Sequence, residues 1–445
     1  GELDKPFYGH YALFFLLPCR LLHLLGMPYH MAIASCIAAA SLATLLATLC
    51  VVDRLVKNDG VFLIALLSLG DVYLMYVQKL FFVKDVYLQT IPHRVMFPAI
   101  LSAAMVLSCG KRMGKGRIAA FYALAALAFL WSPETGLVCI ASVSLFVFLG
   151  LLDFSRPVSR ANVARLACCA LLAVLSVLSG YLLVTAYNLL TSGQGVSFKG
   201  FLYPLVAEYG SIAVRTPLPD LLRTWLPVLL FLLSATAVFA GKTLGARDGR
   251  GTDAALLCSA VTALGLMSYF MNNPVQLNIT IVFFQCIMLL APLLDALIRE
   301  ERNFALGPAL SLLLLAVFST FTLGNAGMKE VLTDRRATAW KARGLENFAR
   351  ELDGDIPRGT PAFGRGVPEL FAAMDRDPGV HVIDWVDIMF DRNPIYLQHV
   401  NGQLKDADRF FAYQDSAALL PASADFAIEK EYEYMGWKFA LYRRK

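Results

Sequence analysis

The chain has 445 residues, of which 58% are hydrophobic and 16% are charged, and its formal net charge is +5. An ordinary soluble domain has about 25% charged residues, so this composition excludes a water-soluble globule. Residues 1–324 contain 22 Lys and Arg against 15 Asp and Glu, whereas residues 325–445 contain 17 against 19. The sequence therefore predicts an apolar membrane part and a polar C-terminal part.

The opening of the chain is polar and leads into an interrupted apolar segment. It begins at Gly1 without a signal-peptide pattern, so we expect the natural N-terminus to lie upstream. Residues 11–27 are apolar but are broken by Pro18, Arg20 and His23. This pattern predicts an interfacial helix or a short hairpin in the headgroup region, rather than a span.

Ten apolar runs follow, separated by polar breaks, and each is predicted to be a transmembrane helix. A helix needs about 20 apolar residues to cross a bilayer. The runs are 31–52, 60–78, 96–109, 118–131, 136–152, 166–190, 225–241, 254–271, 276–298 and 304–323. The fold class is therefore an α-helical polytopic membrane protein, with a transmembrane domain at residues 31–324.

The loops between these runs indicate the orientation, because cytoplasmic loops are rich in Lys and Arg. If the chain enters from outside before Met31, the cytoplasmic loops contain 14 Lys and Arg, and the outer loops with the first 30 residues contain 8. The cytoplasmic loops are then 53–59, 110–117, 153–165, 242–253 and 298–303. We expect a multi-pass protein of the plasma or inner membrane, with residues 1–30 and 325–445 both extracytoplasmic.

The C-terminal part, residues 325–445, alternates element types and predicts a small soluble α/β domain. Helical periodicity and short β-rich runs both occur, and the last runs flank a turn. The predicted helices are 337–352 and 367–374, the predicted strands are 380–385 and 410–413, and the predicted hairpin joins 426–433 to 438–442.

Motifs of soluble enzymes do not occur in the sequence. It has no Gly-rich phosphate loop, no Cys or His pair at metal-ligand spacing, no nucleophile elbow and no long basic patch. Neither a metal ligand set nor a nucleic-acid partner is predicted. All nine cysteines lie at or before Cys286, mostly in apolar runs, so no disulfide framework is expected.

Polar residues in the outer loop before residue 96 form the first candidate site. Lys84, Asp85, Tyr87, His93 and Arg94 lie there. One interpretation is that the cations reach the headgroups beside an interfacial aromatic residue. The other is a phosphate site, with His93 and Arg94 as donors at a helix N-terminus that also favours anions.

Further acidic residues are candidates. Glu134 follows Trp131 in a tight link between two spans. A carboxylate at this position has two interpretations, either stabilisation of the helix N-terminus through the helix dipole or a functional role. Asp71 lies within an apolar run, where acids normally face a cavity or a partner. Asp4, with Glu2, belongs to the opening of the chain and is by itself only a solvated terminus.

Together these features resemble the GT-C type of polyprenyl-phosphate-dependent glycosyltransferases, which include protein mannosyltransferases and the aminoarabinose transferases of lipid A. The likeness covers an acidic first outer loop with Glu2 and Asp4, a second outer loop with Asp85, His93 and Arg94, many spans, and an extracytoplasmic C-terminal domain. Such enzymes usually begin with one further span, which this sequence lacks. The catalytic acid is therefore Asp4, Glu2 or a residue upstream.

The resemblance implies transfer of a sugar from a polyprenyl-phosphate donor to an acceptor at the outer face. Asp4 or Asp85 would be the base, His93 and Arg94 would contact the phosphate, and Glu134 would bind acceptor or sugar.

Asp71 joins the substrate-binding candidates as an intramembrane acid. Membrane lipids and the lipid-linked sugar are the expected partners, and a divalent metal is left open as a cofactor. A transporter or flippase, or an assembly protein without catalysis, remains the alternative. The sequence does not indicate the donor sugar, the acceptor or the oligomeric state.

Overall fold

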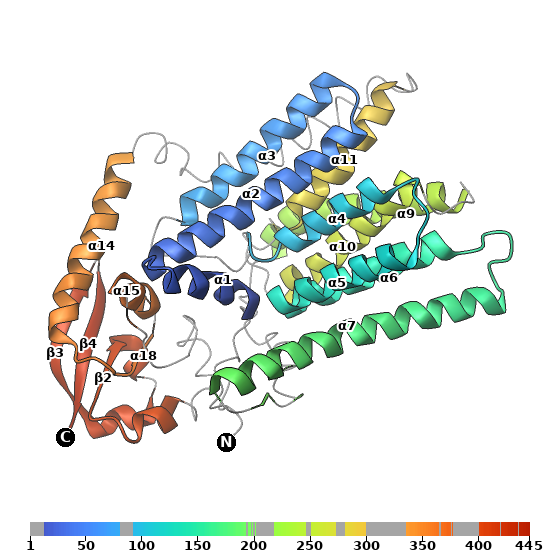
Figure 1. Cartoon of the computed structure of the whole chain (residues 1–445). Coiled ribbons are helices and arrows are strands. Elements are labelled where there is room, and N and C mark those ends of the chain that lie inside the picture. The colour runs from blue at the N-terminus through green and yellow to red at the C-terminus, as the bar shows by residue number, and fades with distance from the viewer. Residues whose placement is uncertain are drawn as a thin grey trace.

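A computed structural model gives the fold as a bundle of long helices and a smaller domain built on a sheet (Figure 1). The structure describes residues 13–80, 92–192, 195–196, 198, 201, 218–245, 251–272, 281–299, 335–364, 366–374, 376, 400–418, 420–434 and 436–445. Both parts that the composition predicts are represented among these residues.

The bundle consists of helices that follow the predicted apolar runs. They are α1 (Leu13–Leu24), α2 (Tyr29–Leu55), α3 (Asp59–Leu80), α4 (Met96–Ser108), α5 (Lys115–Trp131), α6 (Pro133–Leu151), α7 (Arg160–Ser192), α9 (Leu218–Gly245), α10 (Thr252–Asn272) and α11 (Phe283–Arg299). Each predicted span within the described residues coincides with one helix from α2 to α11. The predicted span 304–323 lies outside the described residues, and 276–298 is described only from Ile281.

Length and composition make the described helices those of a membrane protein. Four segments are long and apolar enough to cross a bilayer, namely Ala34–Leu55, Pro133–Leu151, Arg160–Leu190 and Leu226–Gly245. Shorter apolar helices are Asp59–Gly70, Met96–Ser108 and Thr252–Met267. The total of ten spans stays a prediction, since part of the chain lies outside the described residues.

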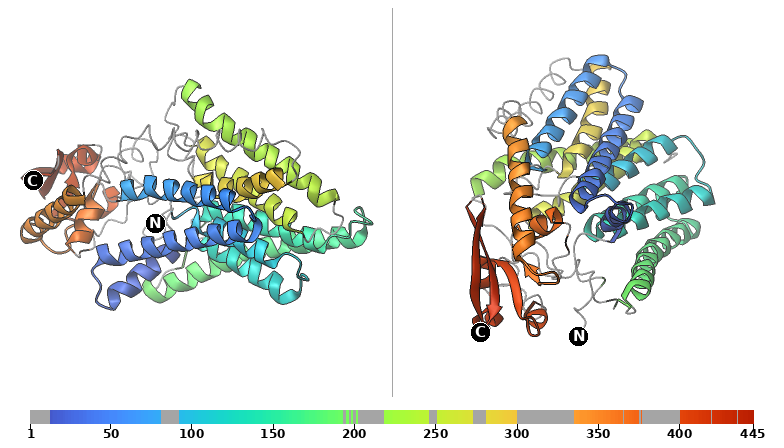
Figure 2. Two further views of the ribbon diagram at one scale, coloured as in Figure 1. Left: turned by 90° about the horizontal axis from the view of Figure 1, so that it is seen from above. Right: turned by 60° about the vertical axis from the view of Figure 1, so that its left-hand side comes forward.

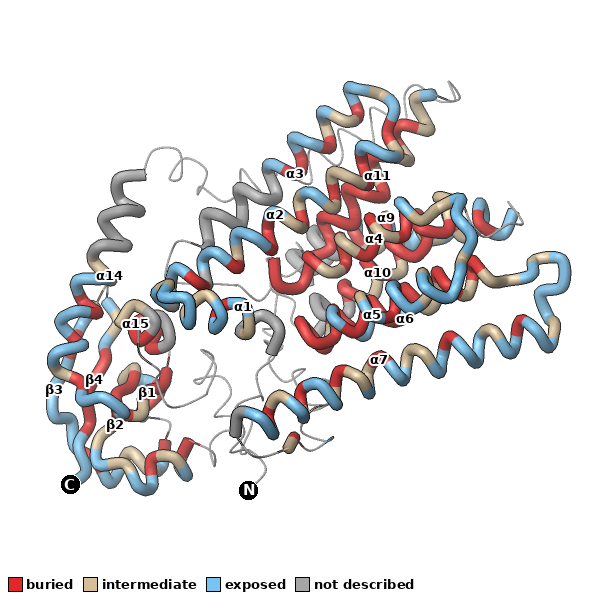
Figure 3. Tube along the Cα trace, in the orientation of Figure 1, coloured by how far each residue is buried: buried red, intermediate tan, exposed pale blue. Residues whose placement is uncertain are grey.

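The surface of the bundle is apolar, as a surface that faces lipid must be. Helix α7 shows this best, because exposed residues recur along its length in Figure 3. Leucines and valines supply many of them, among them Val163, Leu166, Leu171, Val174, Leu175, Leu182 and Leu183. Soluble monomers rarely expose an apolar surface of this extent, and in a bilayer such a surface meets acyl chains instead of water.

Helix pairs pack closely inside the bundle. Phe129 of α5 and Phe283 of α11 are completely or almost completely buried in one core cluster that spans the bundle. Two hydrogen bonds between helices add to this packing. The Tyr122 hydroxyl of α5 donates to Ser144 Oγ at 3.0 Å, and a 2.7 Å bond joins the Thr262 and Ser142 hydroxyls of α10 and α6.

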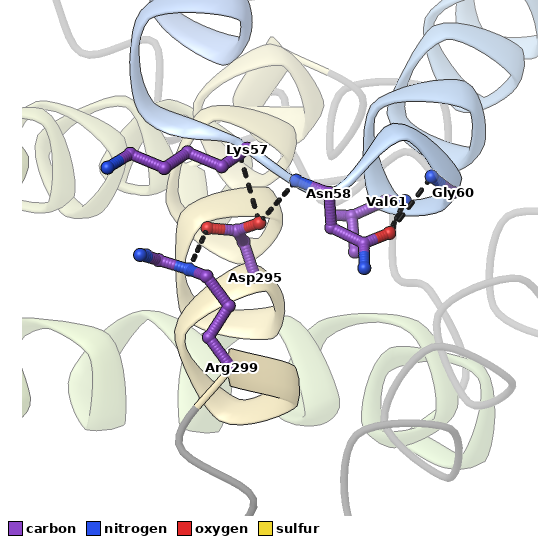
Figure 4. Close-up of polar contacts among 6 residues, drawn as sticks. All are labelled: Lys57, Asn58, Gly60, Val61, Asp295 and Arg299. Carbon is purple, nitrogen blue, oxygen red and sulfur yellow. Dashed lines mark hydrogen bonds and ion pairs between the residues drawn. The ribbon is translucent and has the colours of Figure 1, made fainter.

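A buried carboxylate closes the end of the bundle that is predicted to be cytoplasmic. Asp295 of α11 is 0% exposed and accepts the backbone N–H groups of Lys57 and Asn58, at 3.0 and 2.8 Å, just before α3 begins (Figure 4). Arg299 lies one turn further along α11 and pairs with the same carboxylate at 2.8 Å. These partners satisfy two backbone donors at the start of α3 and balance the charge.

Contacts between distant segments agree with the predicted alternation of the chain across the membrane. Asp295 and Asn58 are separated by an even number of predicted spans, so both are predicted to lie at the inner end. Arg20 of α1 and Tyr187 of α7 are likewise separated by an even number, and the guanidinium donates to the hydroxyl at 3.1 Å. One missed or extra span would place the members of each pair on opposite faces.

The C-terminal domain is a four-stranded sheet with helices. Its sheet has the order β1-β2-β4-β3, in which β1 pairs with β2 in parallel and the other pairs are antiparallel. The strands are β1 (Ala362–Phe363), β2 (Arg409–Tyr413), β3 (Phe426–Tyr434) and β4 (Trp437–Arg444). The helices are α14 (Arg335–Asp355), α15 (Val367–Ala373) and α18 (Gln414–Ala418), with a 3-10 turn at Pro421–Asp425.

Apolar side chains cover both faces of this sheet. On one face, Phe411 and Phe439 stack at 5.8 Å and pack with Leu352 of α14. On the other, Phe410 and Tyr442 stack at 4.5 Å. A domain with two cores of its own is the small α/β domain that alternating elements predict.

Most predicted elements of this domain are confirmed. The predicted helices 337–352 and 367–374 correspond to α14 and α15, the predicted strand 410–413 to β2, and the predicted hairpin to β3 and β4, whose turn has Gly436 at φ +81°. The predicted strand 380–385 lies outside the described residues. The domain lies beside the end of the bundle where α1 and the beginning of α2 meet, and α15 contacts α2 (Figure 2).

Candidate functional site

Two of the predicted clusters meet in the structure. Arg94 belongs to a turn just before α4, in which the N–H groups of Val95 and Met96 donate to the carbonyl of Pro92. Glu134 is the second residue of α6. The Arg94 guanidinium donates through Nη2 to Glu134 Oε2 at 3.0 Å, which makes an ion pair between the beginnings of two helices.

The two charges of this pair differ in burial. The Arg94 side chain is 4% exposed, whereas that of Glu134 is 26% exposed. A carboxylate is favoured in the first turn of a helix, but a guanidinium ahead of a helix N-terminus is not. Glu134 therefore both gains from the α6 dipole and offsets the burial of Arg94, and it is the member of the pair that a substrate can reach.

An indole anchors the turn that carries Arg94. Trp131, the last residue of α5, donates from Nε1 to the backbone carbonyl of His93 at 2.7 Å. The His93 and Trp131 rings also stack, with centroids 5.5 Å apart and an interplanar angle of 27°, and Phe97 packs on the indole at 5.8 Å. His93 is 2% exposed and Trp131 is 8% exposed, so the turn that carries Arg94 is packed against the end of α5.

Close packing of α5 against α6 holds Trp131 and Glu134 in place. Ser132 is extended at φ −152°, and Pro133 begins α6 immediately after it. One turn into α6, Gly136 lies so near α5 that a Cβ built on it would be 2.1 Å from the Cα of Phe129. Only glycine fits this crossing, because any side chain would overlap the backbone of α5.

The remaining predicted site residues lie wholly or partly outside the described part of the chain. Asp4 and Asp85, the two candidates for the base, lie outside the described residues. Asp71 lies on α3, but its side chain is also outside the described part. Among the described residues, no group of three His, Cys, Asp or Glu side chains could hold a metal ion. The described part of the site thus provides no metal centre by itself.

The sequence does not indicate two features of the site. It places Trp131 in the link with Glu134 but gives it no role, and it does not connect Arg94 to Glu134. A signal for the link is present, because opposite charges lie at the beginnings of two spans that both start on the predicted outer side. Such residues are brought to the same depth in the membrane by the alternation of the chain alone.

Comparison with known proteins identifies no family. No protein-family model matches the chain, and no curated protein matches it. Among solved structures, it is similar to the Archaeoglobus fulgidus oligosaccharyltransferase, solved in complex with Zn and sulfate, at 14% identity and a TM-score of 0.47. The match covers 98% of this chain but 65% of that one, so the chain spans less than two thirds of that protein. At this TM-score the likeness does not establish a common fold.

Proposed function

We propose that this chain is a membrane glycosyltransferase that moves a sugar from a polyprenyl-phosphate donor to an acceptor at the extracytoplasmic face. The observation that carries the proposal is the ion pair of Arg94 and Glu134 at the beginnings of α4 and α6. Both residues belong to the end of the bundle that the distribution of Lys and Arg assigns to the outside. Charged groups at the membrane are costly, and those that persist usually serve a function.

The chemistry of such a transfer needs few groups. The lipid phosphate is already a good leaving group, so the enzyme must orient the acceptor hydroxyl, accept its proton and stabilise the departing phosphate. In this proposal, Glu134 binds hydroxyl groups of the sugar or the acceptor. Asp4 or Asp85 accepts the proton, and the acidic residue Asp71 contributes to substrate binding.

Arg94 has two roles in this proposal. It holds Glu134 in position, and its positive charge stabilises the phosphate that leaves. A guanidinium carries a permanent positive charge and five N–H donors in a fixed planar arrangement, which suits both carboxylates and phosphates. His93 would complete the phosphate contact, and the C-terminal domain beside this end of the bundle would recognise the acceptor.

The test is transfer of radiolabelled hexose from polyprenyl-phosphate hexose by membranes that contain the full-length chain. The measured products are the transferred sugar and the released polyprenyl phosphate. Glu134→Gln and Arg94→Lys should each lower transfer by roughly tenfold or more, which corresponds to about 1.4 kcal/mol and to one charge-assisted hydrogen bond. Arg20→Lys is the matched control, because Arg20 is an exposed cation of the predicted outer side and should stay within about twofold.

A double variant separates a structural ion pair from a catalytic one. Arg94→Gln leaves Glu134 without its partner and Glu134→Gln leaves a buried cation, whereas the double variant Arg94→Gln with Glu134→Gln removes both charges together. We expect the double variant to regain thermal stability without regaining transfer. Recovery of both would make the pair structural. Movement of the donor across the membrane with its sugar–phosphate bond intact would instead make the chain a flippase.

A further inference from the structure

Two cysteine side chains meet where α1 packs against the beginning of α2. Cys19 of α1 is 3% exposed and Cys36 of α2 is 9% exposed, and both belong to one packed apolar cluster. Helices α1 and α2 pack against one another along this cluster, and the two thiols are neighbours within it. The structure has both as thiols. A disulfide bond requires converging Cβ atoms, and two cysteines that enter one packed cluster from adjacent helices can meet this requirement.

This pair lies on the side of the membrane where disulfides form. The distribution of Lys and Arg places the chain ahead of residue 31 outside, and Cys19 is in that part. Cys36 lies less than two turns into α2, at the same end of the bundle. Extracytoplasmic compartments are oxidising, whereas the cytoplasm keeps thiols reduced.

We propose that Cys19 and Cys36 are joined by a disulfide that ties the interfacial helix α1 to α2. The sequence predicts no disulfide framework, because both cysteines lie in apolar runs, and only the packing of α1 on α2 reveals the pair. The oxidant is a protein disulfide of the outer compartment. One cysteine thiolate attacks this disulfide, forming a mixed disulfide and releasing one thiol, and the second cysteine then displaces the other thiol. Two electrons and two protons leave the cysteine pair in this exchange.

The bond forms before α1 is fully packed. Burial raises the pKa of the Cys19 thiol to about 12, so in the folded protein it is scarcely ionised and reacts slowly. While α1 is still exposed, its thiol has an ordinary pKa and exchange is fast. Once α1 has docked, the same burial protects the disulfide from reductants.

The proposed disulfide lies close to the ion pair of Arg94 and Glu134. The cluster that contains both cysteines also contains Met96, the first residue of α4, and Trp131. Trp131 anchors the backbone of His93, next to Arg94. Helix α1 contains Pro18 among its 12 described residues and packs on the bundle through this cluster. A disulfide to α2 fixes α1 against the cluster.

The test is the oxidation state of the pair in the full-length protein. Cells that express the chain with Cys19 and Cys36, and with alanine at its other cysteines, are quenched in acid. The denatured protein is then reacted with a polyethylene-glycol maleimide, with or without prior reduction. We expect two adducts after reduction and none before it. Adducts at both positions without reduction would overturn the proposal, because the thiols would then exist in the cell.

Two controls make the result specific. A second version retains only Cys109 and Cys258, which pack in one cluster near the predicted cytoplasmic end, and both should be labelled without reduction. Cys19→Ser should leave Cys36 open to labelling without reduction. If the alanine background does not accumulate, unreduced digests of the wild-type chain decide by mass spectrometry. The linked peptide pair, lighter by two hydrogens than its separate peptides, supports the proposal, and only separate thiol peptides refute it.

Discussion

Gly136→Ala adds one carbon atom at the crossing of α5 and α6, beside the candidate site. The new Cβ would lie 2.1 Å from the Cα and 2.4 Å from the backbone nitrogen of Phe129. Ordinary contacts begin at 3.4 Å, so the two helices must separate by roughly 1 Å or more. Overpacking of a core costs about 1–3 kcal/mol. Because a backbone cannot rotate away as a side chain does, we expect a cost of about 3 kcal/mol, and the helix propensity of alanine returns about 1 kcal/mol.

Thermal unfolding in detergent measures this cost. A thiol-reactive fluorophore reports the exposure of buried cysteines such as Cys139 and Cys258, which are 0% exposed. A net loss of about 2 kcal/mol should lower the Tm by about 4–8 °C, taking about 2–4 °C for each kcal/mol. All variants must be heated at one rate, because unfolding of a protein of this kind is commonly irreversible.

The matched control is Gly241→Ala in α9. A Cβ built on Gly241 would meet no atom within 4 Å, so this variant should keep or slightly raise the Tm through helix propensity. At assay temperatures well below its Tm, Gly136→Ala should also lower sugar transfer, because separation of α5 and α6 moves Glu134 away from Arg94. A Tm for Gly136→Ala within about 1 °C of both the wild type and Gly241→Ala would refute the close crossing.

Two further predictions concern the buried carboxylate of Asp295 and the orientation of the chain in the membrane. Asp295→Ala removes the acceptor of two part-buried backbone N–H groups and should cost about 2–5 kcal/mol. Arg299→Ala should cost less, because the Arg299 side chain is 49% exposed and the Asp295 carboxylate keeps both backbone donors. Unfolding by the same fluorescence assay gives the order of the two variants, and an equal or larger effect of Arg299→Ala would contradict it. A cysteine at Ser416, which is buried in the folded domain, should be reached from outside intact cells by a membrane-impermeant maleimide after mild denaturant, and one at Lys115 only after cell disruption. The reverse labelling would overturn the orientation.

Much of the bundle could be predicted from the sequence because hydropathy and charge act locally along a membrane chain. Apolar runs become helices wherever backbone groups must be satisfied without water. Helix ends were less accurate. The apolar run at 166–190 is part of α7, which starts at Arg160 and ends at Ser192. The helix continues into the headgroup region, where the side chains of Arg160 and Arg165 reach water. A hydropathy pattern does not include these polar residues, so it predicts a helix that is too short.

The site could be predicted only in parts. His93, Arg94 and Glu134 were identified as separate groups, since each is a polar residue next to an apolar run. Their pairing depends on which helices pack together, and that is set by non-local fit. The sequence around Gly136 contains no sign that the backbone of Phe129 lies against it, although this crossing positions Glu134. Hydropathy gives the depth of a residue in the membrane but not its neighbour.

The ion pair combines these local and non-local requirements. Arg94 lies ahead of the positive end of α4, and a neutral residue there would avoid both an unfavourable dipole and the burial of a charge. Glu134 offsets this cost, yet replacing both by apolar residues of similar size would remove it entirely, because buried ion pairs rarely stabilise more than such residues do. Stability alone therefore does not explain why this position holds a guanidinium. A ligand that needs a fixed positive charge beside a reachable carboxylate does explain it, and a sugar attached to a lipid phosphate has the hydroxyl groups and the anion that such a pair would bind.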